Sequence, residues 1–309
     1  MGKTKIPKIL VIGDIMLDYC EFGLSHRLSP EAPVPIIQEI TKKTYALGGA
    51  GNVSANLSRF PCSVSYFGII GDDTIGKKVK QLLNKHKINT DHLLVRAGNK
   101  TTLKKRIFCN NAQICRFDSD VYLELKNDEL LINNILKNQY DCIIISDYNK
   151  GCITNTLIKN LTTLKSKLNL KIVVDPKPRS SISYENVDYI TPNQSEARLL
   201  FDYGPQCANQ SEYLKAFLKH MKCKGIVITR AEKGLIAMLR NKPMIKIDAI
   251  ESKVVDVCGA GDTLIAGFAY AIAAGYNFEK ACEIGNQMAG IVVKDQGTSL
   301  PDKSLMQKF

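Results

Sequence analysis

Short apolar runs recur along the chain, and each ends in a polar or charged residue. The first run, KILVI, covers residues 8–12, and four later runs begin at residues 142, 171, 189 and 225 and read CIIISD, KIVVDP, YITPN and GIVIT. Continuous apolar runs of this length are typical of parallel strands buried on both faces. Helical segments are expected between them, at 154–167 and from Gln194 onward. This alternation predicts a doubly wound, mostly parallel α/β sheet flanked by helices.

Two other segments have a pattern that does not fit the main sheet. Arg27 to Glu39 alternates apolar and polar residues and carries prolines at 30, 33 and 35, which suit edge strands and forbid a helix. Thr101 to Asp118 contains two alternating runs joined by Asn-Asn-Ala-Gln, the turn chemistry of a hairpin. We therefore expect one domain over 1–309, with a small β-sheet lid inserted at about 20–45 and 100–118. Because such a lid exposes strand edges, pairing with a second copy is expected, which makes a homodimer.

Composition excludes several classes of protein. The 309 residues are 45% hydrophobic and 23% charged, which is ordinary for a soluble globular chain. No apolar stretch is long enough for a membrane span and no secretory signal precedes the first strand, so a cytoplasmic protein is expected. The ten cysteines include no Cys-x-x-Cys pair, and the four histidines lack metal-ligand spacing. The net charge of +12 is dispersed without aromatic interleaving, which argues against nucleic-acid binding and leaves an acidic small molecule as the partner.

The segment Val254 to Gly275, VVDVCGAGDTLIAGFAYAIAAG, combines a strand end, a glycine turn and a long apolar helix. Small residues at 259–261 would let a ligand approach the backbone, and the free N–H groups of a first helical turn attract phosphate oxygens. Asp262 follows directly, where a carboxylate would repel phosphate unless it served as a general base. An Asp that simply caps a core helix is the alternative. This stretch alone leaves both interpretations open.

Other polar residues follow the predicted strands, and the carboxyl ends of parallel strands are where open α/β sheets bind ligands. They are expected to line one crevice: Asp14, Asp18, Gly48, Gly49, Asn52, Asp147, Asp175, Lys177, Arg179, Asn193, Glu196, Thr229 and Arg230. Two familiar phosphate motifs are excluded. Gly71 to Lys78, GDDTIGKK, lacks the Ser or Thr of a P-loop and is expected to open a helix, and no G-x-G-x-x-G occurs.

DVCGAGDTLIAGF resembles the C-terminal signature of the ribokinase-like (PfkB) carbohydrate kinases, with Cys258 where that family usually has Thr. The resemblance implies that Asp262 is the catalytic base and that Gly259, Ala260 and Gly261 form the anion hole. LGGAGN is similar to the family's sugar-contacting segment, which assigns Gly48, Gly49 and Asn52 to the sugar. NQSE is similar to its N-x-x-E, which gives Asn193 to the nucleotide and lets Glu196 hold Mg²⁺ through water. The resemblance further implies an ATP site with Thr229, Arg230, Gly234 and Asn286, and K⁺ or another monovalent cation near Asp256.

Within that family, RLSPEAPVPI, GDIMLD, SDYNKG, DPKP and GTS resemble the D-glycero-D-manno-heptose 7-phosphate kinases of bacterial lipopolysaccharide precursor synthesis. The resemblance implies MgATP-dependent phosphorylation of the anomeric hydroxyl to the 1,7-bisphosphate, with a nucleotidyltransferase domain or protein acting downstream. A sugar 7-phosphate needs charge-assisted donors. Lys177 is expected to hold it, and Arg179, Lys104, Arg106 and Arg116 are further candidates. Two alternatives remain: a kinase of the same fold for fructose 1-phosphate, fructose 6-phosphate or a nucleoside, and a non-catalytic binding protein.

Overall fold

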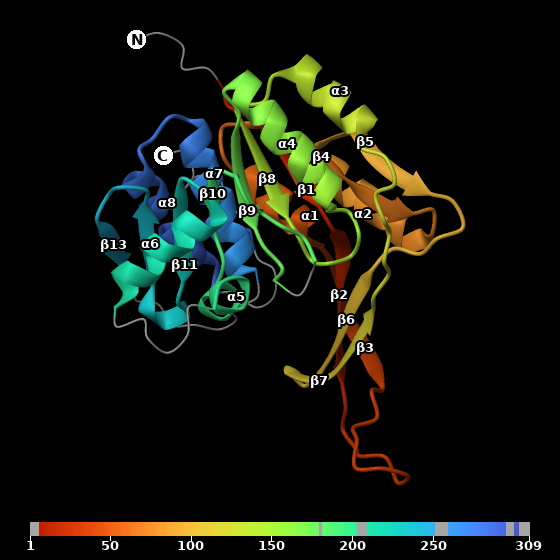
Figure 1. Ribbon diagram of the computed structural model, residues 1–309. Coiled ribbons are helices and arrows are strands. Elements are labelled where there is room, and N and C mark those ends of the chain that lie inside the picture. The colour runs from red at the N-terminus through yellow and green to blue at the C-terminus, as the bar shows by residue number, and fades with distance from the viewer. Residues whose placement is uncertain (1–5, 179–180, 203–208, 251–258, 295–299, 303–309) are drawn as a thin grey trace.

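The computed structural model describes residues 6–178, 181–202, 209–250, 259–294 and 300–302. Its centre is a nine-stranded sheet in the order β13-β12-β11-β10-β9-β8-β1-β4-β5, parallel except for the pairs β11–β12 and β12–β13 (Figure 1). These strands are β1 (Lys8–Gly13), β4 (Ser63–Gly71), β5 (Asn89–Arg96), β8 (Cys142–Ser146), β9 (Lys171–Asp175), β10 (Tyr189–Ile190), β11 (Gly225–Thr229), β12 (Leu235–Leu239) and β13 (Met244–Ile247). The predicted doubly wound α/β sheet is confirmed.

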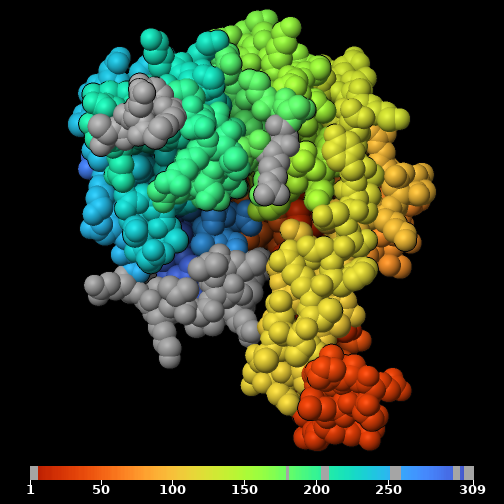
Figure 2. Space-filling view, turned by 60° about the horizontal axis from the view of Figure 1, so that its bottom comes forward, coloured from red at the N-terminus to blue at the C-terminus, as the bar shows by residue number. Residues whose placement is uncertain are grey.

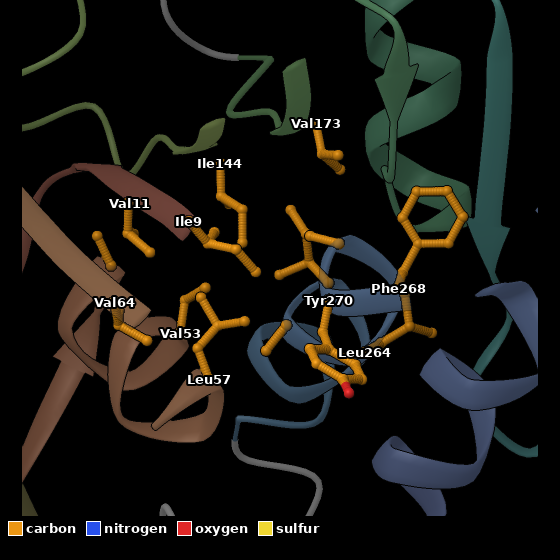
Figure 3. Close-up of a cluster of buried hydrophobic side chains, with 14 of the residues drawn as sticks. Ile9, Val11, Val53, Leu57, Val64, Ile144, Val173, Leu264, Phe268 and Tyr270 are labelled. Carbon is orange, nitrogen blue, oxygen red and sulfur yellow. The ribbon is translucent and has the colours of Figure 1, made fainter. Parts of the chain in front are cut away.

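Helices cover both faces of this sheet, because its central strands are apolar on both sides. Along β1, Ile9 and Val11 belong to one buried cluster, whereas Leu10 and Ile12 belong to the other. The first cluster is completed by α1 (Ala50–Leu57), α2 (Thr74–Lys85), α7 (Ala260–Ala273) and α8 (Phe278–Val292), and Figure 3 shows part of it. The second is completed by α3 (Glu129–Asn138), α4 (Asn155–Leu168), α5 (Gln194–Leu200) and α6 (Gln210–Met221).

A separate four-stranded sheet projects from this body as the lid, in the order β3-β2-β6-β7 (Figures 1 and 2). Its strands are β2 (Ile15–Leu24), β3 (Glu39–Gly49), β6 (Leu103–Cys109) and β7 (Ala112–Ser119). The hairpin turn between β6 and β7 falls at Asn110 and Asn111, both with positive φ, as its turn chemistry predicts. The lid sheet starts earlier than expected, because β2 follows β1 after a single residue.

The proline-rich segment is not the pair of edge strands that its alternation suggested. Residues 25–38 form an irregular loop at the tip of the lid, in which a single bridge joins Leu28 to Pro35. Prolines supply no N–H for a ladder, so the ladder between β2 and β3 stops before the proline-rich loop. The loop therefore extends the lid without adding strands to it.

The segment GDDTIGKK opens α2, as predicted, and holds no phosphate loop. Asp73 caps the helix by accepting a hydrogen bond from the Gly76 N–H at 2.9 Å. The same carboxylate accepts from the backbone N–H and the hydroxyl of Thr101. Asp73 is thus fully engaged in joining α2 to the strand that leads into the lid.

Candidate active site

Asp262 lies in the first turn of α7 and is 6% exposed. Its Oδ2 accepts a hydrogen bond from Asn52 Nδ2, and its Oδ1 accepts one from the Tyr148 hydroxyl, each at 2.8 Å. Burial raises the pKa of Asp262 to about 6, although both hydrogen bonds act in the opposite direction. A carboxylate held in place with a pKa near neutrality has the properties of a general base.

A buried amide network fixes the orientation of Asn52. Asn56 Nδ2 donates to Asn52 Oδ1 at 3.2 Å, and the Thr263 hydroxyl donates to Asn56 Oδ1 at the same distance. Because the oxygen of Asn52 is occupied, its Nδ2 is the atom that faces Asp262. The helices α1 and α7 therefore hold the carboxylate between them, and the predicted grouping of Asn52 with Asp262 is observed.

The glycine turn before Asp262 leaves backbone open to a ligand. Gly259 adopts φ 81, in the left-handed region that favours glycine, and caps α7. A Cβ built on Gly261 would meet nothing within 4 Å, so space is open beside this backbone. Gly259, Ala260 and Gly261 thus stand at the N-terminus of a helix, where free N–H groups and the helix dipole favour anions.

A cavity of about 160 Å³ adjoins this turn. It is lined by residues from the ends of several strands together with the start of α7: Tyr148, Asp175, Thr191, Asn193, Glu196, Thr229, Gly259, Gly261, Asp262 and Leu264. Of the residues predicted to line one crevice, Asp175, Asn193, Glu196 and Thr229 line this cavity. Burial and the neighbouring charges of Asp262 and Glu196 raise the pKa of Asp175 well above its ordinary value. Among the described residues no group of three or more acidic, histidine or cysteine side chains is placed to hold a metal by itself, so the predicted Mg²⁺ contact of Glu196 stays a prediction.

Lys177 lies among these carboxylates. Its ammonium is 3.6 Å from Glu196 Oε1, while Glu196 Oε2 accepts from the backbone N–H of Asn193 in a capping box. In the sheet, β9, β10 and β11 lie beyond β8 as seen from β1. Lys177 therefore pairs with a residue that lines the cavity, and its assignment to the 7-phosphate stays a prediction.

The lid presents a charged face. One row of paired residues crosses the four strands and consists of Asp118, Lys104, Asp18 and Ala46. In the next row on the same face, Arg116 pairs with Arg106. Arg106 donates to Asp18 Oδ1 at 2.9 Å, and Arg116 forms two hydrogen bonds of 2.8 Å with Asp118. Asp18 and Lys104 both influence the pKa of Asp262, so this face lies near the candidate base.

Glycines at the end of β3 let the carboxylate of Asp18 lie against the backbone of this neighbouring lid strand. A Cβ on Gly48 would lie 2.7 Å from Asp18 Oδ2, and Gly49 adopts φ 59 where it leads into α1. Neither position accommodates a larger side chain without displacing its neighbours. Asp18 and Gly48 are therefore neighbours, and the assignment of Asp18, Gly48 and Gly49 to the sugar stays a prediction.

Asp14 and Asp147, which are predicted to bind sugar, both accept hydrogen bonds from the chain itself. Asp14 is buried and accepts hydrogen bonds from the N–H groups of Tyr148, Lys150 and Cys152, at 2.9–3.0 Å. Asp147 accepts from the Asn149 N–H and the Tyr184 hydroxyl. Asp14 thus holds the loop that carries Tyr148, and Asp147 joins that loop to Tyr184. The assignment of both carboxylates to the sugar stays a prediction.

The remaining predicted nucleotide residues surround the turn after β11. Thr229 lines the cavity, and Arg230 donates its backbone N–H to the Gly234 carbonyl at 2.8 Å across a short 3₁₀ helix, η1 (Ala231–Lys233). Asn286 of α8 donates to the Asp248 carbonyl at 2.9 Å, which fixes the helix to the chain beyond β13. Asp256, Cys258 and Arg179 lie outside the described residues, so the cation and signature predictions for them stay predictions.

The pfkB family carbohydrate kinase model matches residues 6–305. The chain belongs to this family. It is 34% identical over 314 residues to bifunctional protein HldE of Sulfurimonas denitrificans, a match that covers 99% of this chain and 65% of that protein. The chain thus spans just under two thirds of the length of this relative.

Solved structures of two kinases have the same fold. Arabidopsis thaliana ribokinase complexed with ribose and ATP superimposes with a TM-score of 0.76 at 18% identity, covering 98% of both chains. Phosphofructokinase-2 from Escherichia coli in complex with potassium gives a TM-score of 0.76 at 17% identity, again covering 98% of both. The ribokinase-like fold is therefore confirmed, and the chain is a sugar kinase of the pfkB family. Within the described residues, no helix is long and apolar enough to cross a membrane.

Sequence reasoning missed Tyr148 and placed Asp175 in the crevice without a role of its own. Tyr148 follows Asp147 in the SDYNKG segment, and Asp175 ends the strand KIVVD. Both positions follow the rule that polar residues at strand ends line the site. That rule does not tell a catalytic partner from a loop residue, and the hydroxyl of Tyr148 meets Asp262 from 114 positions away.

Proposed function

We propose that this chain phosphorylates the anomeric hydroxyl of D-glycero-D-manno-heptose 7-phosphate with MgATP. The single observation that carries the catalytic part is the buried Asp262 at the glycine-led start of α7, held by Asn52 and Tyr148. A non-catalytic binding protein would have no need for a carboxylate with this pKa beside an anion site.

In the proposed reaction, Asp262 takes the proton from the anomeric hydroxyl while the oxygen of that hydroxyl forms a bond to the γ-phosphorus of ATP. The bond from that phosphorus to the β–γ bridging oxygen breaks in line, and ADP and the sugar 1,7-bisphosphate result. The N–H groups at Gly259 to Gly261 would stabilise charge on the transferring group. Bound Mg²⁺ would neutralise phosphate charge, and Asp175 and Glu196 are the residues placed to hold it, directly or through water.

The heptose assignment rests on the sequence segments of the lid and strand ends, and the match to bifunctional protein HldE supports it. That relative is named bifunctional, and it is longer than this chain. Both facts fit the expectation of a nucleotidyltransferase that acts downstream. The lid face adds a chemical reason for a phosphorylated acceptor. Lys104, Arg106 and Arg116 stand on the same face as Asp18, near the candidate base. We assign the sugar hydroxyls to Asp18 and Asn52 and the 7-phosphate to these cations.

ADP release over a panel of acceptors tests the substrate: heptose 7-phosphate, unphosphorylated heptose, fructose 1-phosphate, fructose 6-phosphate and a nucleoside. Heptose 7-phosphate should give the highest kcat/KM. Arg106→Ala should raise the KM for it roughly tenfold and leave the weak turnover of unphosphorylated heptose unchanged. Lys105→Ala is the matched control, because this lysine pairs with Glu21 on the other face of β6 at 2.7 Å. A higher kcat/KM for a fructose phosphate or a nucleoside would reject heptose as the substrate.

Asp262→Asn tests the base separately. The substitution keeps the size of the side chain and removes the proton acceptor, so kcat should fall by roughly 10²–10⁴. ATP binding measured by calorimetry should persist, because the glycine turn is unchanged. Retention of more than a tenth of wild-type turnover on every acceptor would overturn the catalytic assignment.

A further inference from the structure

A second cavity, of about 810 Å³, lies between α6 and the turn that joins β12 to β13. It is at the opposite edge of the sheet from Asp262. Gly225, at the start of β11, pairs with Leu239 beside this turn, whereas Thr229 at the other end of β11 lines the active-site cavity. Figure 1 places α6 and β13 on the side of the body away from the lid. We call this cavity the α6 groove.

The rim of the α6 groove is cationic. Five of its lining residues are Lys215, Lys219, Lys222, Arg240 and Lys242, and no carboxylate is among the lining residues. The three lysines of the α6 segment are spaced four and three residues apart, which places them on one helix face. Arg240 and Lys242 approach from the β12–β13 turn. The groove is therefore flanked by positive charge on both sides.

Most of this charge is not neutralised by the protein. Lys222 pairs with Glu185 at 2.7 Å, but Lys215, Lys219 and Lys242 form no ion pair among the residues that the structure describes. Arg240 donates to the carbonyls of Leu218 and Cys223, and this capping of the C-terminal end of α6 accounts for its own position. Helix capping does not account for the position of Lys215, which lies more than one turn before the end of α6. It also does not account for the position of Lys242, which lies across the groove from α6. Their mutual repulsion favours an anionic ligand.

The floor of the groove is apolar. Pro243 and Met244 give the groove its accessible apolar lining, whereas Leu218 and Met238 are almost fully buried beneath them. Thioether and aliphatic groups give a surface on which a flat ring can pack. Simple phosphate would use the rim and leave this floor uncovered, whereas a ligand with a ring and several negative charges would use both. The volume is in the range of sites for small molecules and cofactors.

We propose that the α6 groove is a second nucleotide site, which takes a nucleoside di- or triphosphate. The base packs on Met244 and Pro243, and the phosphates lie against Lys215, Lys219 and Lys242 on the rim. This site is separate from the nucleotide consumed in the reaction, because it is on the other edge of the sheet. It does not depend on which sugar the enzyme phosphorylates.

Equilibrium dialysis of the whole chain with labelled ADP and Mg²⁺ at low ionic strength tests the proposal. Wild type should bind two ADP molecules per chain, and added salt should weaken the second, because exposed charges are screened. Lys219→Ala/Lys242→Ala removes two unpaired rim cations and keeps Arg240. Its second-site affinity should fall at least roughly tenfold, and turnover should not change. Lys159→Ala/Lys167→Ala removes equal charge from exposed positions of α4, and this control should keep both sites.

Binding of a single ADP per chain by wild type overturns the proposal, as does an unchanged second site in Lys219→Ala/Lys242→Ala. Two further probes decide the ligand class. Inorganic tripolyphosphate that binds the groove where ADP does not would show that charge alone is recognised and would reject a nucleotide. An amphipathic peptide rich in glutamate and leucine that binds there in place of ADP would assign the groove to a protein partner and also reject it.

Discussion

The hydroxyl of Tyr148 donates a hydrogen bond to Oδ1 of Asp262 at 2.8 Å, and it does so from a loop that Asp14 holds in place. The ammonium of Lys104 lies 5.9 Å from the centre of the same tyrosine ring. Tyr148 therefore stands between the candidate base and the cationic face of the lid. A residue in this position influences both the proton affinity of Asp262 and the space left for an acceptor.

We predict that Tyr148→Phe moves the acid limb of the kcat–pH profile to higher pH. The hydrogen bond from Tyr148 lowers the pKa of Asp262, so its removal raises that pKa further above its value of about 6. Activity should fall more at pH 6 than at pH 8, because the base must be deprotonated to accept a proton. Tyr140→Phe, which removes a buried hydroxyl bonded to Asn134, is the control and should leave the profile unchanged. An unshifted acid limb in Tyr148→Phe would contradict the assigned role.

The sequence is sufficient to predict those parts of the molecule that local pattern determines. The apolar runs determine the strands, the Asn-Asn turn determines the lid hairpin, and the glycine turn before Asp262 determines the start of α7. Sequence could not assign the roles of Asp14 and Lys177, because both depend on tertiary neighbours. Asp14 meets backbone N–H groups 134 to 138 residues away. The surroundings of Lys177 follow from the order of strands in the sheet, which no local pattern encodes.

Asp262→Asn should also change the pH dependence of stability. Because burial raises the pKa of Asp262 in the folded protein from 3.8 to about 6, its contribution to stability is fully present below pH 3.8 and is lost as pH rises through 6. The uncharged variant escapes this loss. At pH 8 it should therefore unfold at a higher temperature than wild type. The gain in the free energy of unfolding should be on the order of 3 kcal/mol at most. At pH 4 the difference should nearly vanish.

Thermal unfolding of both proteins between pH 4 and pH 8 measures this effect. Asp248→Asn is a suitable control, because that carboxylate is largely exposed beside Lys246 and its loss should not produce the same pH-dependent gap. An Asp262→Asn variant that is less stable than wild type at pH 8 would mean that its hydrogen bonds with Asn52 and Tyr148 outweigh the cost of burying the charge.

The outer face of the lid should form a dimer interface. This face is the one opposite Asp18 and Arg106. A row across all four strands lies on it and consists of Phe117, Lys105, Tyr19 and Tyr45. Phe117 is 59% exposed, and Tyr19 stacks on the partly exposed Tyr45 at 4.6 Å. Aromatic groups on a sheet with open edges favour a second copy. Sedimentation equilibrium should give a dimer at micromolar concentration and a monomer for Phe117→Glu. Leu199→Glu, on exposed α5, should remain dimeric, and a monomeric wild type would reject the interface.

Lys177 should act on the nucleotide and leave acceptor binding unchanged. Its ammonium lies 3.6 Å from Glu196, beside the cavity that Asp175 and the glycine turn also line. A cation there can offset phosphate charge near carboxylates that would otherwise repel it. Lys177→Ala should therefore weaken ATP binding roughly tenfold and leave the affinity for heptose 7-phosphate unchanged, both measured by calorimetry. Lys171→Ala removes the same charge from the other end of β9 and should change neither affinity. The reverse result in Lys177→Ala, with heptose 7-phosphate weakened and ATP unaffected, would identify Lys177 as the 7-phosphate ligand and remove that role from Arg106 and Arg116.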